Sequence, residues 1–407
     1  MSSEHLGDRV YRLRRTAGLT QEGLAGRSGI SVDVVRKLEQ KRKSSARLPT
    51  LHALAKGLGV EVTALLGDPP AVPSTGEAEP PALVAVRRAI MPPLFAPPVE
   101  PSGVETLSLP LLRAEIAAAW TLYHAADFAQ VMEMLPGIIA DARLTSAVGN
   151  IEQRATGQGA LAKALQLGGH LAVRLGKTDL ALSSLERALN AADASDDPLL
   201  APMICGSVAW AYQRQNRLDD AGNLAVHAAD GVERGHLHRA EGVRVWGGLL
   251  MSAATSAARS GDYDTANDMM RTAERATHRL SALPPPADGR LVSVFSKSSV
   301  RIERVRLAVQ HAHPEEALRL ASGMRLSTDT PLSWRTWLLL DVARAYADTG
   351  NTQGAADSLT KLHRLAPAWM RHHTLAVAIV QDLRAESPGT PGLRKLADFL
   401  GDADTRA

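Results

Sequence analysis

The sequence has almost no cysteine and no long hydrophobic run. Cys205 is the only cysteine among 407 residues, which excludes an intramolecular disulfide and a zinc site built on several cysteines. No stretch approaches the 18 apolar residues that suggest a transmembrane helix. The N-terminus leads directly into a charged amphipathic segment rather than a signal peptide. We therefore expect a cytoplasmic protein without membrane contact.

Patterns typical of enzymes, nucleotide sites and metal sites are also missing. Gly176–Thr178 matches the end of a phosphate-binding loop, but Leu171 stands where that motif needs a glycine. Histidines two residues apart, such as His311 and His313, point to different sides of a helix and are poorly placed to share a metal. No combination of nucleophile, base and oxyanion donor is recognisable. We predict no enzymatic activity, no cofactor and no metal.

Positive charge is concentrated near the N-terminus. Residues 1–67 contain twelve Lys and Arg against six Asp and Glu, a net charge of +6. The whole chain has a formal charge of +3, so the remaining 340 residues carry −3. This concentration favours a polyanionic partner for the N-terminal segment.

Two short helices joined by a tight turn are predicted in this basic segment. Thr20 is a good N-cap for the first helix, and Ser28-Gly29 stops it because glycine adopts the left-handed conformation without steric cost. Ser31 caps the second helix. That helix has an apolar side formed by Val34, Val35 and Leu38. Its polar side consists of Val32, Asp33, Arg36, Lys37 and Gln40. A capped pair of this kind is typical of a helix-turn-helix.

The segment resembles the Xre/Cro-type (lambda-repressor-like) DNA-binding domain over about residues 4–67. The resemblance rests on Leu19–Glu22, Leu24-Ala25, Ser28–Ser31, Leu38-Glu39, Pro49–Leu51, Leu54-Ala55, Leu58–Val60 and Leu65-Leu66. It implies five helices around one small core, the fifth over Val60–Leu66. Gly23 and Gly26 depart from the helix formers usual at these positions, and each glycine costs about 0.5–1 kcal/mol in a helix interior.

The resemblance also implies which side chains contact double-stranded DNA. Arg36, Lys37 and Gln40, with Val32 and Asp33 near the helix start, are expected to face base edges in the major groove. Asp33 could equally serve the helix dipole. The predicted phosphate contacts are Thr20, Gln21, Lys41, Arg42, Lys43 and Arg47. The cap Ser31 is also expected to belong to the DNA-binding residues.

A proline-rich linker follows, from residue 68 to residue 103. Eleven of the 23 prolines lie between Pro69 and Pro110, a composition typical of extended, semi-stiff chain. One piece, Ala82–Ile90, carries Leu83, Val86 and Ile90 at helical spacing. We predict a short helix there that docks on a neighbouring domain.

Residues 104–407 contain a repeating helical pattern. A turn is followed by apolar or small residues at spacings of four and three, which predicts six helix pairs and a C-terminal cap. The six sets are Val131/Leu135/Ile138, Ala181/Leu185/Ala188, Ala221/Ala225/Ala228, Ala266/Met270/Ala273, Ala317/Ala321/Met324 and Ala355/Leu359/Leu362. Stacked helical hairpins of this kind form an α-solenoid, because no hairpin buries its apolar face alone.

This part resembles degenerate tetratricopeptide repeats, most closely at Arg259–Ala266. The fold class is therefore all-α: a five-helix DNA-binding domain (1–67), a linker with a short helix (68–103) and a solenoid of helical hairpins (104–407). The combination resembles peptide-responsive quorum-sensing regulators of the RRNPP group and actinobacterial regulators of the same layout. It implies a homodimer that reads a two-fold-related operator and senses a signalling peptide or small molecule.

Two alternatives remain open at this point. One is a repeat scaffold that tethers a partner protein. The other is the DNA-binding component of a defence or toxin–antitoxin system.

Overall fold

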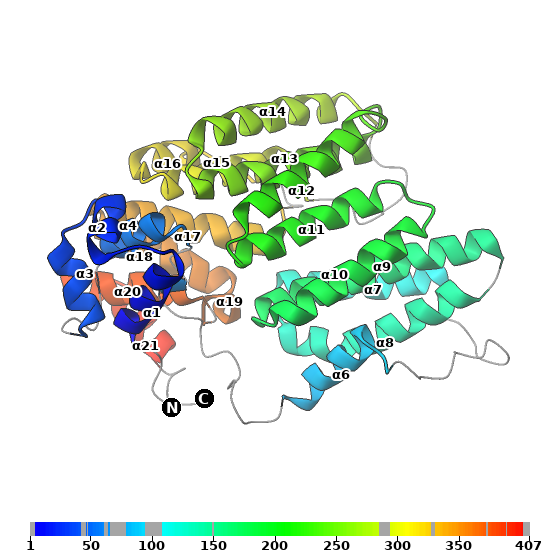
Figure 1. The fold of residues 1–407 in the computed structure, drawn as a ribbon, viewed down its shortest axis with the longest axis horizontal. Coiled ribbons are helices and arrows are strands. Elements are labelled where there is room, and N and C mark those ends of the chain that lie inside the picture. Colours follow the sequence, from blue (N-terminus) through cyan, green and yellow to red (C-terminus); the bar gives the residue numbers. More distant parts are fainter. Residues whose placement is uncertain are drawn as a thin grey trace. The chain divides into compact units, whose positions relative to one another are not determined.

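The computed structural model of the chain (Figure 1) describes residues 5–41, 46, 48–60, 64–65, 79–93, 108–148, 150–284, 294–326, 330–371, 373–387 and 389–401. These residues form 20 α-helices and no strand, which confirms the all-α prediction. The chain divides into two compact units. Unit 1 consists of Met1–Pro70, Arg301–Thr328 and Leu332–Ala407, and unit 2 of Ala71–Val300 and Asp329–Pro331.

Four short helices at the start of unit 1 form the predicted helix-turn-helix segment. They are α1 (Leu6–Thr16), α2 (Gln21–Ser28), α3 (Val32–Glu39) and α4 (Leu48–Leu58). Helix α1 packs against α3 and α4, and α2 packs against α3 and α4. Their shared core contains Val10, Leu24, Val35, Leu38 and Leu54, all fully buried. Most of the predicted fifth helix lies outside the described residues.

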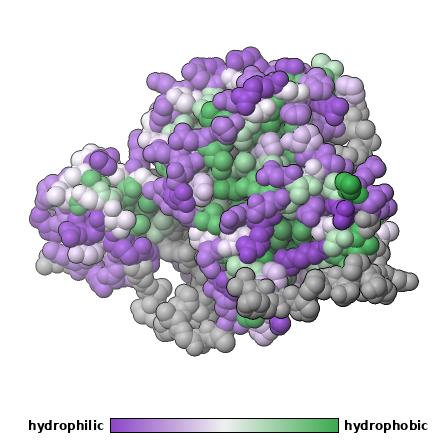
Figure 2. Space-filling view, turned by 45° about the vertical axis from the view of Figure 1, so that its right-hand side comes forward, coloured by the Kyte–Doolittle hydropathy of each residue, from purple (hydrophilic) through white to green (hydrophobic). Residues whose placement is uncertain are grey.

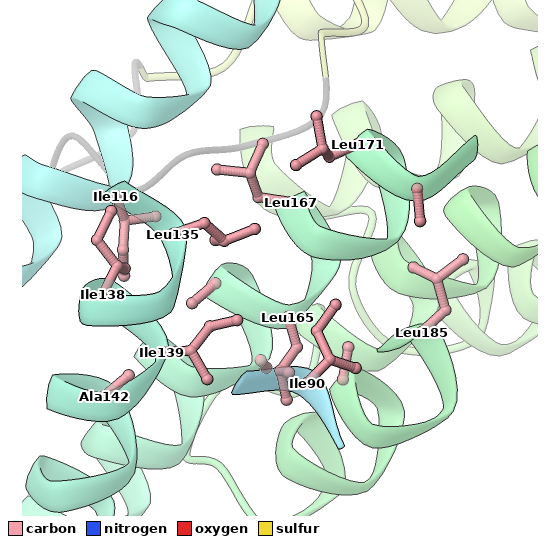
Figure 3. Packing of buried hydrophobic residues seen from close by; sticks show 14 of the residues in the cluster. Ile90, Ile116, Leu135, Ile138, Ile139, Ala142, Leu165, Leu167, Leu171 and Leu185 are labelled. Atoms are coloured by element: carbon pink, nitrogen blue, oxygen red, sulfur yellow. The ribbon is translucent and has the colours of Figure 1, made fainter. Parts of the chain in front are cut away.

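The helix expected within the linker is α6 (Pro81–Ile90). Its apolar residues Leu83, Val86 and Ile90 are buried in the core of unit 2. Figure 3 shows Ile90 among the side chains of this core, close to Leu165. The guanidinium of Arg87 donates hydrogen bonds to Glu79 and to Asp179, which lies in the second helix pair.

Six helix pairs follow in the described residues, and this confirms the predicted solenoid of helical hairpins. The pairs are α7 (Leu109–His124) with α8 (Phe128–Ala147), α9 (Ile151–Arg174) with α10 (Thr178–Asp193), α11 (Leu200–Arg214) with α12 (Leu218–Glu233), α13 (Ala240–Ser260) with α14 (Tyr263–Ser281), α15 (Lys297–Gln310) with α16 (Pro314–Ala321), and α17 (Leu332–Asp348) with α18 (Thr352–Leu365). The end of the chain adds α19 (Pro367–Arg371), α20 (Thr374–Glu386) and α21 (Leu393–Gly401).

The turn inside each pair contains one residue with a left-handed backbone. These residues are Ala126, Gly176, Asn216, Gly261, Ala312 and Gly350, with φ between 59° and 92°. Each lies five residues before the first position of the predicted set in its pair. The left-handed residue reverses the chain so that the second helix packs back on the first.

The predicted small and apolar positions of the second helices are buried in every pair except the fifth. In the pairs other than the fifth, every member of the predicted sets is buried. In the fifth pair only Ala317 is buried, whereas Ala321 and Met324 are half-buried. Helix α16 ends at Ala321, so the prediction that Met324 continues this helix is wrong. Both residues still pack, half-buried, against the core around Ala317.

The first helices of the pairs in unit 2 form one continuous layer. Helix α7 contacts α9, α9 contacts α11, and α11 contacts α13. Side chains that project from neighbouring first helices therefore meet. The face shown in Figure 2 is mostly hydrophilic, with hydrophobic residues gathered between hydrophilic ones. Among the described residues, no helix is long and apolar enough to cross a membrane.

Candidate nucleic-acid interface

Helices α2 and α3 are joined by the turn that the sequence predicts. The Thr20 hydroxyl accepts a hydrogen bond from the Gly23 amide at 2.9 Å and caps α2. Gly29 ends α2 with φ 65°, and the Ser31 hydroxyl accepts from the Val34 amide at 3.4 Å. The caps fix where α3 begins and therefore which of its residues point away from the core.

Helix α3 is fixed against α1 by a close backbone contact. Val35 and Leu38 are fully buried beneath it. A Cβ atom on Gly7 of α1 would lie only 2.0 Å from the carbonyl oxygen of Leu38. Only glycine permits this approach, so Gly7 sets the distance between α1 and the end of α3.

A buried ion pair joins α1 to the end of α3. The Arg14 guanidinium donates to both carboxylate oxygens of Glu39, with Nε–Oε1 2.6 Å and Nη2–Oε2 2.8 Å. The side chains of Arg14 and Glu39 are 7% and 5% exposed. Hydrogen bonding to Glu39 raises the pKa of Arg14. Arg14 also donates to the Leu19 carbonyl oxygen at 2.8 Å, which holds the start of α2 in the same network.

The sequence pattern does not identify this pair, because Arg14 is one of twelve positive charges in residues 1–67 and Glu39 belongs to a family motif. A usable signal was present, because Arg14 lies four residues after the buried Val10 and thus on the core side of α1. A charge in that position needs a partner of opposite sign.

Gln21 belongs to the same network. Its Nε2 donates to Glu39 Oε2 at 2.8 Å, and its side chain is half-buried. Glu39 therefore orients the side-chain amide of Gln21. The phosphate contact of Gln21 stays a prediction.

The outward side of α3 carries exposed, polar side chains. Arg36 is 50% exposed, and its Nη2 lies 3.9 Å from Glu22 Oε1 on α2. Lys37 Nζ lies 2.7 Å from Asp33 Oδ2, one turn earlier on the same helix. Gln40 is exposed at the C-cap. These three predicted base-reading residues thus lie on one face of the helix.

The remaining predicted contacts surround this face. Thr20 and Ser31 are exposed at the two N-caps, and Val32 is half-buried at the first turn of α3. Lys41 has a left-handed backbone with φ 58°, and its Nζ lies 2.9 Å from Asp8 Oδ2 on α1. Hydrogen bonding to Lys41 lowers the pKa of Asp8. The predicted phosphate contacts Arg42, Lys43 and Arg47 lie outside the described residues.

The two unusual glycines of α2 have different surroundings. A Cβ on Gly26 would meet no atom within 4 Å, so no packing contact requires glycine there. A Cβ on Gly23 would lie 3.3 Å from the capping Thr20 Oγ1, a tight contact. Across the described residues, no group of three or more His, Cys, Asp and Glu side chains is placed to hold a metal.

Known proteins resemble this segment in sequence. Residues 5–66 match a helix-turn-helix domain family. The chain is 44% identical over 55 residues to an uncharacterized HTH-type transcriptional regulator, y4dJ, of Sinorhizobium fredii. That match covers 14% of this chain and 70% of y4dJ.

Solved structures resemble more of the chain at low identity. PlcR of Bacillus thuringiensis, in complex with the peptide PapR7 and DNA, is 14% identical with a TM-score of 0.38, over 79% of this chain and 94% of that one. A Rap protein complexed with competence and sporulation factor is 10% identical with a TM-score of 0.43, over 73% and 90%.

Proposed function

We propose that this chain, which belongs to the HTH-type transcriptional regulators, binds DNA with α3 in the major groove. The observation that carries the proposal is the division of α3 into a buried side and a polar outward side. Val35 and Leu38 are fully buried, while Arg36 and Gln40 are exposed. An α-helix fits the major groove, and base edges there present a distinct pattern of donors and acceptors.

The proposed base contacts follow from the side-chain chemistry. Arg36 suits the two acceptors of guanine, and Gln40 suits adenine. The ion pair from Arg36 to Glu22 is long and exposed, and pairs of this kind contribute about 0–1 kcal/mol. The Arg36 guanidinium can therefore leave the Glu22 carboxylate and bind a base with little loss of free energy. We assign Asp33 to hold Lys37 and to stabilise the helix N-terminus, in view of their 2.7 Å contact.

The proposed phosphate contacts flank the recognition helix. Thr20 and Gln21 lie at the start of α2, and Lys41 follows α3. Arg42, Lys43 and Arg47 extend the same basic segment in the sequence. Contacts of this type position the protein on the duplex without reading its sequence.

We further propose a homodimer that reads a two-fold-related operator. Its recognition helices would have to lie about 34–36 Å apart to enter successive turns of the groove. The helical repeats are proposed to provide the dimer contact and to bind a signalling peptide or small molecule. Such a ligand regulates DNA binding only if it binds two states of the dimer unequally.

Selection of binding sites from random DNA tests the base-reading role. We expect Arg36→Ala to lose its preference at one base-pair position, a loss of about 1–3 kcal/mol in discrimination. Lys41→Ala should weaken binding to all DNA sequences alike. It should also reduce the slope of log K against log salt concentration by about 1. Arg319→Ala is the matched control, because Arg319 is an exposed arginine of α16 that pairs with Glu316.

Two outcomes would overturn the proposal. If Arg36→Ala selects the same sites as the unchanged chain, α3 does not read bases through this residue. If the full chain shows no salt-sensitive DNA binding at all, the repeat scaffold becomes the better account. Light scattering of the free protein separately tests the dimer.

A further inference from the structure

A cluster of aromatic rings joins three first helices of unit 2. It consists of Trp120, Tyr123 and His124 on α7, His170 and Arg174 on α9, and Trp210 on α11, and we call it the α9 cluster. The His170 ring is central, with its centroid 5.0 Å from that of Trp120, 5.7 Å from that of Tyr123 and 4.9 Å from that of Trp210. Trp120, His170 and Trp210 are half-buried.

The inner side of the α9 cluster is held by neutral hydrogen bonds. His170 Nε2 lies 2.9 Å from the Ser207 hydroxyl, and Gln166 Nε2 donates to the same oxygen at 2.9 Å. Gln166 and Ser207 are buried. The central ring is therefore fixed in position before any ligand arrives, a form of pre-organisation that favours binding.

Among the described residues, Arg174 forms its hydrogen bond and its ring contact with aromatic side chains, and no carboxylate pairs with it. Its Nε donates to the Tyr123 hydroxyl at 3.2 Å, and its guanidinium lies 5.3 Å from the centroid of the Trp210 ring. By contrast, Arg87 is paired with Glu79 and Asp179. Arg174 is exposed and leaves most of its five N–H donors available for an acceptor.

The electrostatic surroundings of the α9 cluster are positive. Burial lowers the pKa of His170 to about 3, and the charges that lower it further are those of His124 and Arg174. Burial likewise lowers the pKa of His124 to about 4, with a contribution from Arg174. The residues of the α9 cluster thus carry one positive charge, that of Arg174, and no negative charge, and this balance favours an anion.

A second cluster in unit 1 has the same residue types but a different balance of charge. Arg306 lies 4.9 Å from the Trp337 ring centroid, and the Trp337 and His373 rings are 4.6 Å apart. Here Glu303 and Asp341 accept hydrogen bonds from Arg306. The chain thus supplies the anion itself in unit 1, whereas the residues of the α9 cluster include no carboxylate.

We propose that the α9 cluster binds an aromatic carboxylate, with the carboxylate on the Arg174 guanidinium and the flat ring against Trp120, His170 and Trp210. Arginine and carboxylate form paired, charge-assisted hydrogen bonds, and flat rings pack against aromatic side chains. The proposal rests on the proposed function, since it gives the signal ligand a chemical class and a place. The carboxylate can belong to a free aromatic acid or to a peptide that ends in an aromatic residue.

Calorimetry of the full chain without DNA tests the site directly. The probes are N-acetyl-phenylalanine and its amide, which share the ring and differ in the negative charge. We expect the acid to bind at least about 10-fold more tightly than the amide, because a hydrogen bond to a charged group contributes about 1.5–3 kcal/mol. A peptide with a C-terminal phenylalanine, in free and amidated forms, distinguishes a peptide source from a small acid.

The variant Arg174→Gln should lose this preference, with binding of the acid reduced to that of the amide. Arg217→Gln is the matched control, because Arg217 lies 3.9 Å from the Tyr212 ring centroid but has its own carboxylate, Asp220. That variant should bind both probes as the unchanged chain does. Circular dichroism establishes that both variants are folded.

Three results would overturn the proposal: equal binding of acid and amide, unchanged binding by Arg174→Gln, or no saturable binding of the acid below about 10 mM. Because no DNA is present, failure here is separate from failure of DNA binding. If the chain binds the acid but its DNA affinity is the same with and without the acid, the binding site is supported. Its role in regulating DNA binding is then contradicted.

Discussion

The helix-turn-helix segment and the repeats of unit 2 bury their polar side chains in different ways. The helix-turn-helix segment buries a charged pair, Arg14 with Glu39. Unit 2 buries neutral groups where first helices meet, such as Gln166 with Ser207 and Gln213 with Ser256. A buried charge that loses its partner costs far more than a neutral hydrogen bond.

The difference follows from the size of the elements. Helices α2 and α3 have 8 residues each, whereas α9 has 24 and α13 has 21. Short helices around a small core have few apolar contacts to define their positions. The charged pair gives α3 one strongly preferred position relative to α1, and this is the helix proposed to enter the groove. In unit 2, the long helices α9 and α13 meet α11 through the neutral pairs instead.

The largest predicted effect is the loss of Glu39. Glu39→Ala leaves the Arg14 guanidinium buried without its carboxylate, and we expect a loss of about 3–5 kcal/mol in the stability of α1–α3. Hydrogen exchange of the amides in α1 and α3 measures this, and α7–α14 should keep their protection. Arg36→Ala, which removes an exposed pair, is the control and should cost about 0–1 kcal/mol. Similar losses of stability in Glu39→Ala and Arg36→Ala would contradict the difference between a buried and an exposed ion pair.

Acid should act on unit 2 through its half-buried histidines, His124 and His170. Burial lowers the pKa of His170 to about 3 and that of His124 to about 4 in the folded chain, below the usual 6.5. The unfolded chain then binds more protons below pH 6.5, so stability falls as the pH drops from 6.5 through these values, by a few kcal/mol at most. Urea unfolding of unit 2 followed by tryptophan fluorescence measures the slope.

The variant His170→Asn isolates the contribution of this ring. It removes the histidine with the lower pKa, so its stability should depend less on pH between 6.5 and 4 than that of the unchanged chain. An equally steep dependence in both proteins would show that His170 is not held neutral by burial.

A smaller effect is expected at the contact between α1 and α3. A Cβ on Gly7 would meet the Leu38 carbonyl oxygen at 2.0 Å, and backbone atoms cannot turn aside as a side chain does. Gly7→Ala should cost about 1–3 kcal/mol through overpacking. It should also weaken DNA binding, because α3 must move. Exchange protection of α3 and DNA affinity should fall together; loss of neither would contradict the account.

The smallest effects are two opposite exchanges of alanine and glycine. Gly26→Ala should stabilise α2 by about 0.5–1 kcal/mol, because Gly26 is in a helix interior with open space around it. Ala312→Gly should stabilise the fifth repeat by a similar amount of about 1 kcal/mol, because Ala312 has a left-handed backbone with φ 59°. Thermal unfolding of each variant provides the measurement, and a lower midpoint in either would contradict the local argument.

The sequence predicts local features of this fold well because caps and turns depend on neighbouring residues. Thr20, Ser31 and Gly29 act where the pattern places them. The helical repeats are also predicted, because the turn and the small residues of each pair lie in one stretch of chain. The prediction for Met324 is wrong because Ser322-Gly323 ends α16 before it, with Gly323 in a left-handed backbone at φ 66°.

Contacts between distant residues are harder to predict. The partners Arg14 and Glu39 are 25 residues apart, and Arg87 and Asp179 are 92 apart. No spacing rule joins such pairs before the helices are placed. The α9 cluster has the same difficulty, since its rings come from three helices that only the stacked repeats bring together. The base-reading residues themselves stay predictions, because local pattern defines the exposed side of α3 and not what binds to it.

The most direct test of the central claim is hydrogen exchange of the full chain with and without its selected DNA site. If α3 lies in the groove, amides of residues 20–41 should gain protection on DNA binding, and α7–α14 should show no comparable gain. Protection confined to the repeats, with residues 20–41 unchanged, would contradict the assignment of DNA binding to the helix-turn-helix segment.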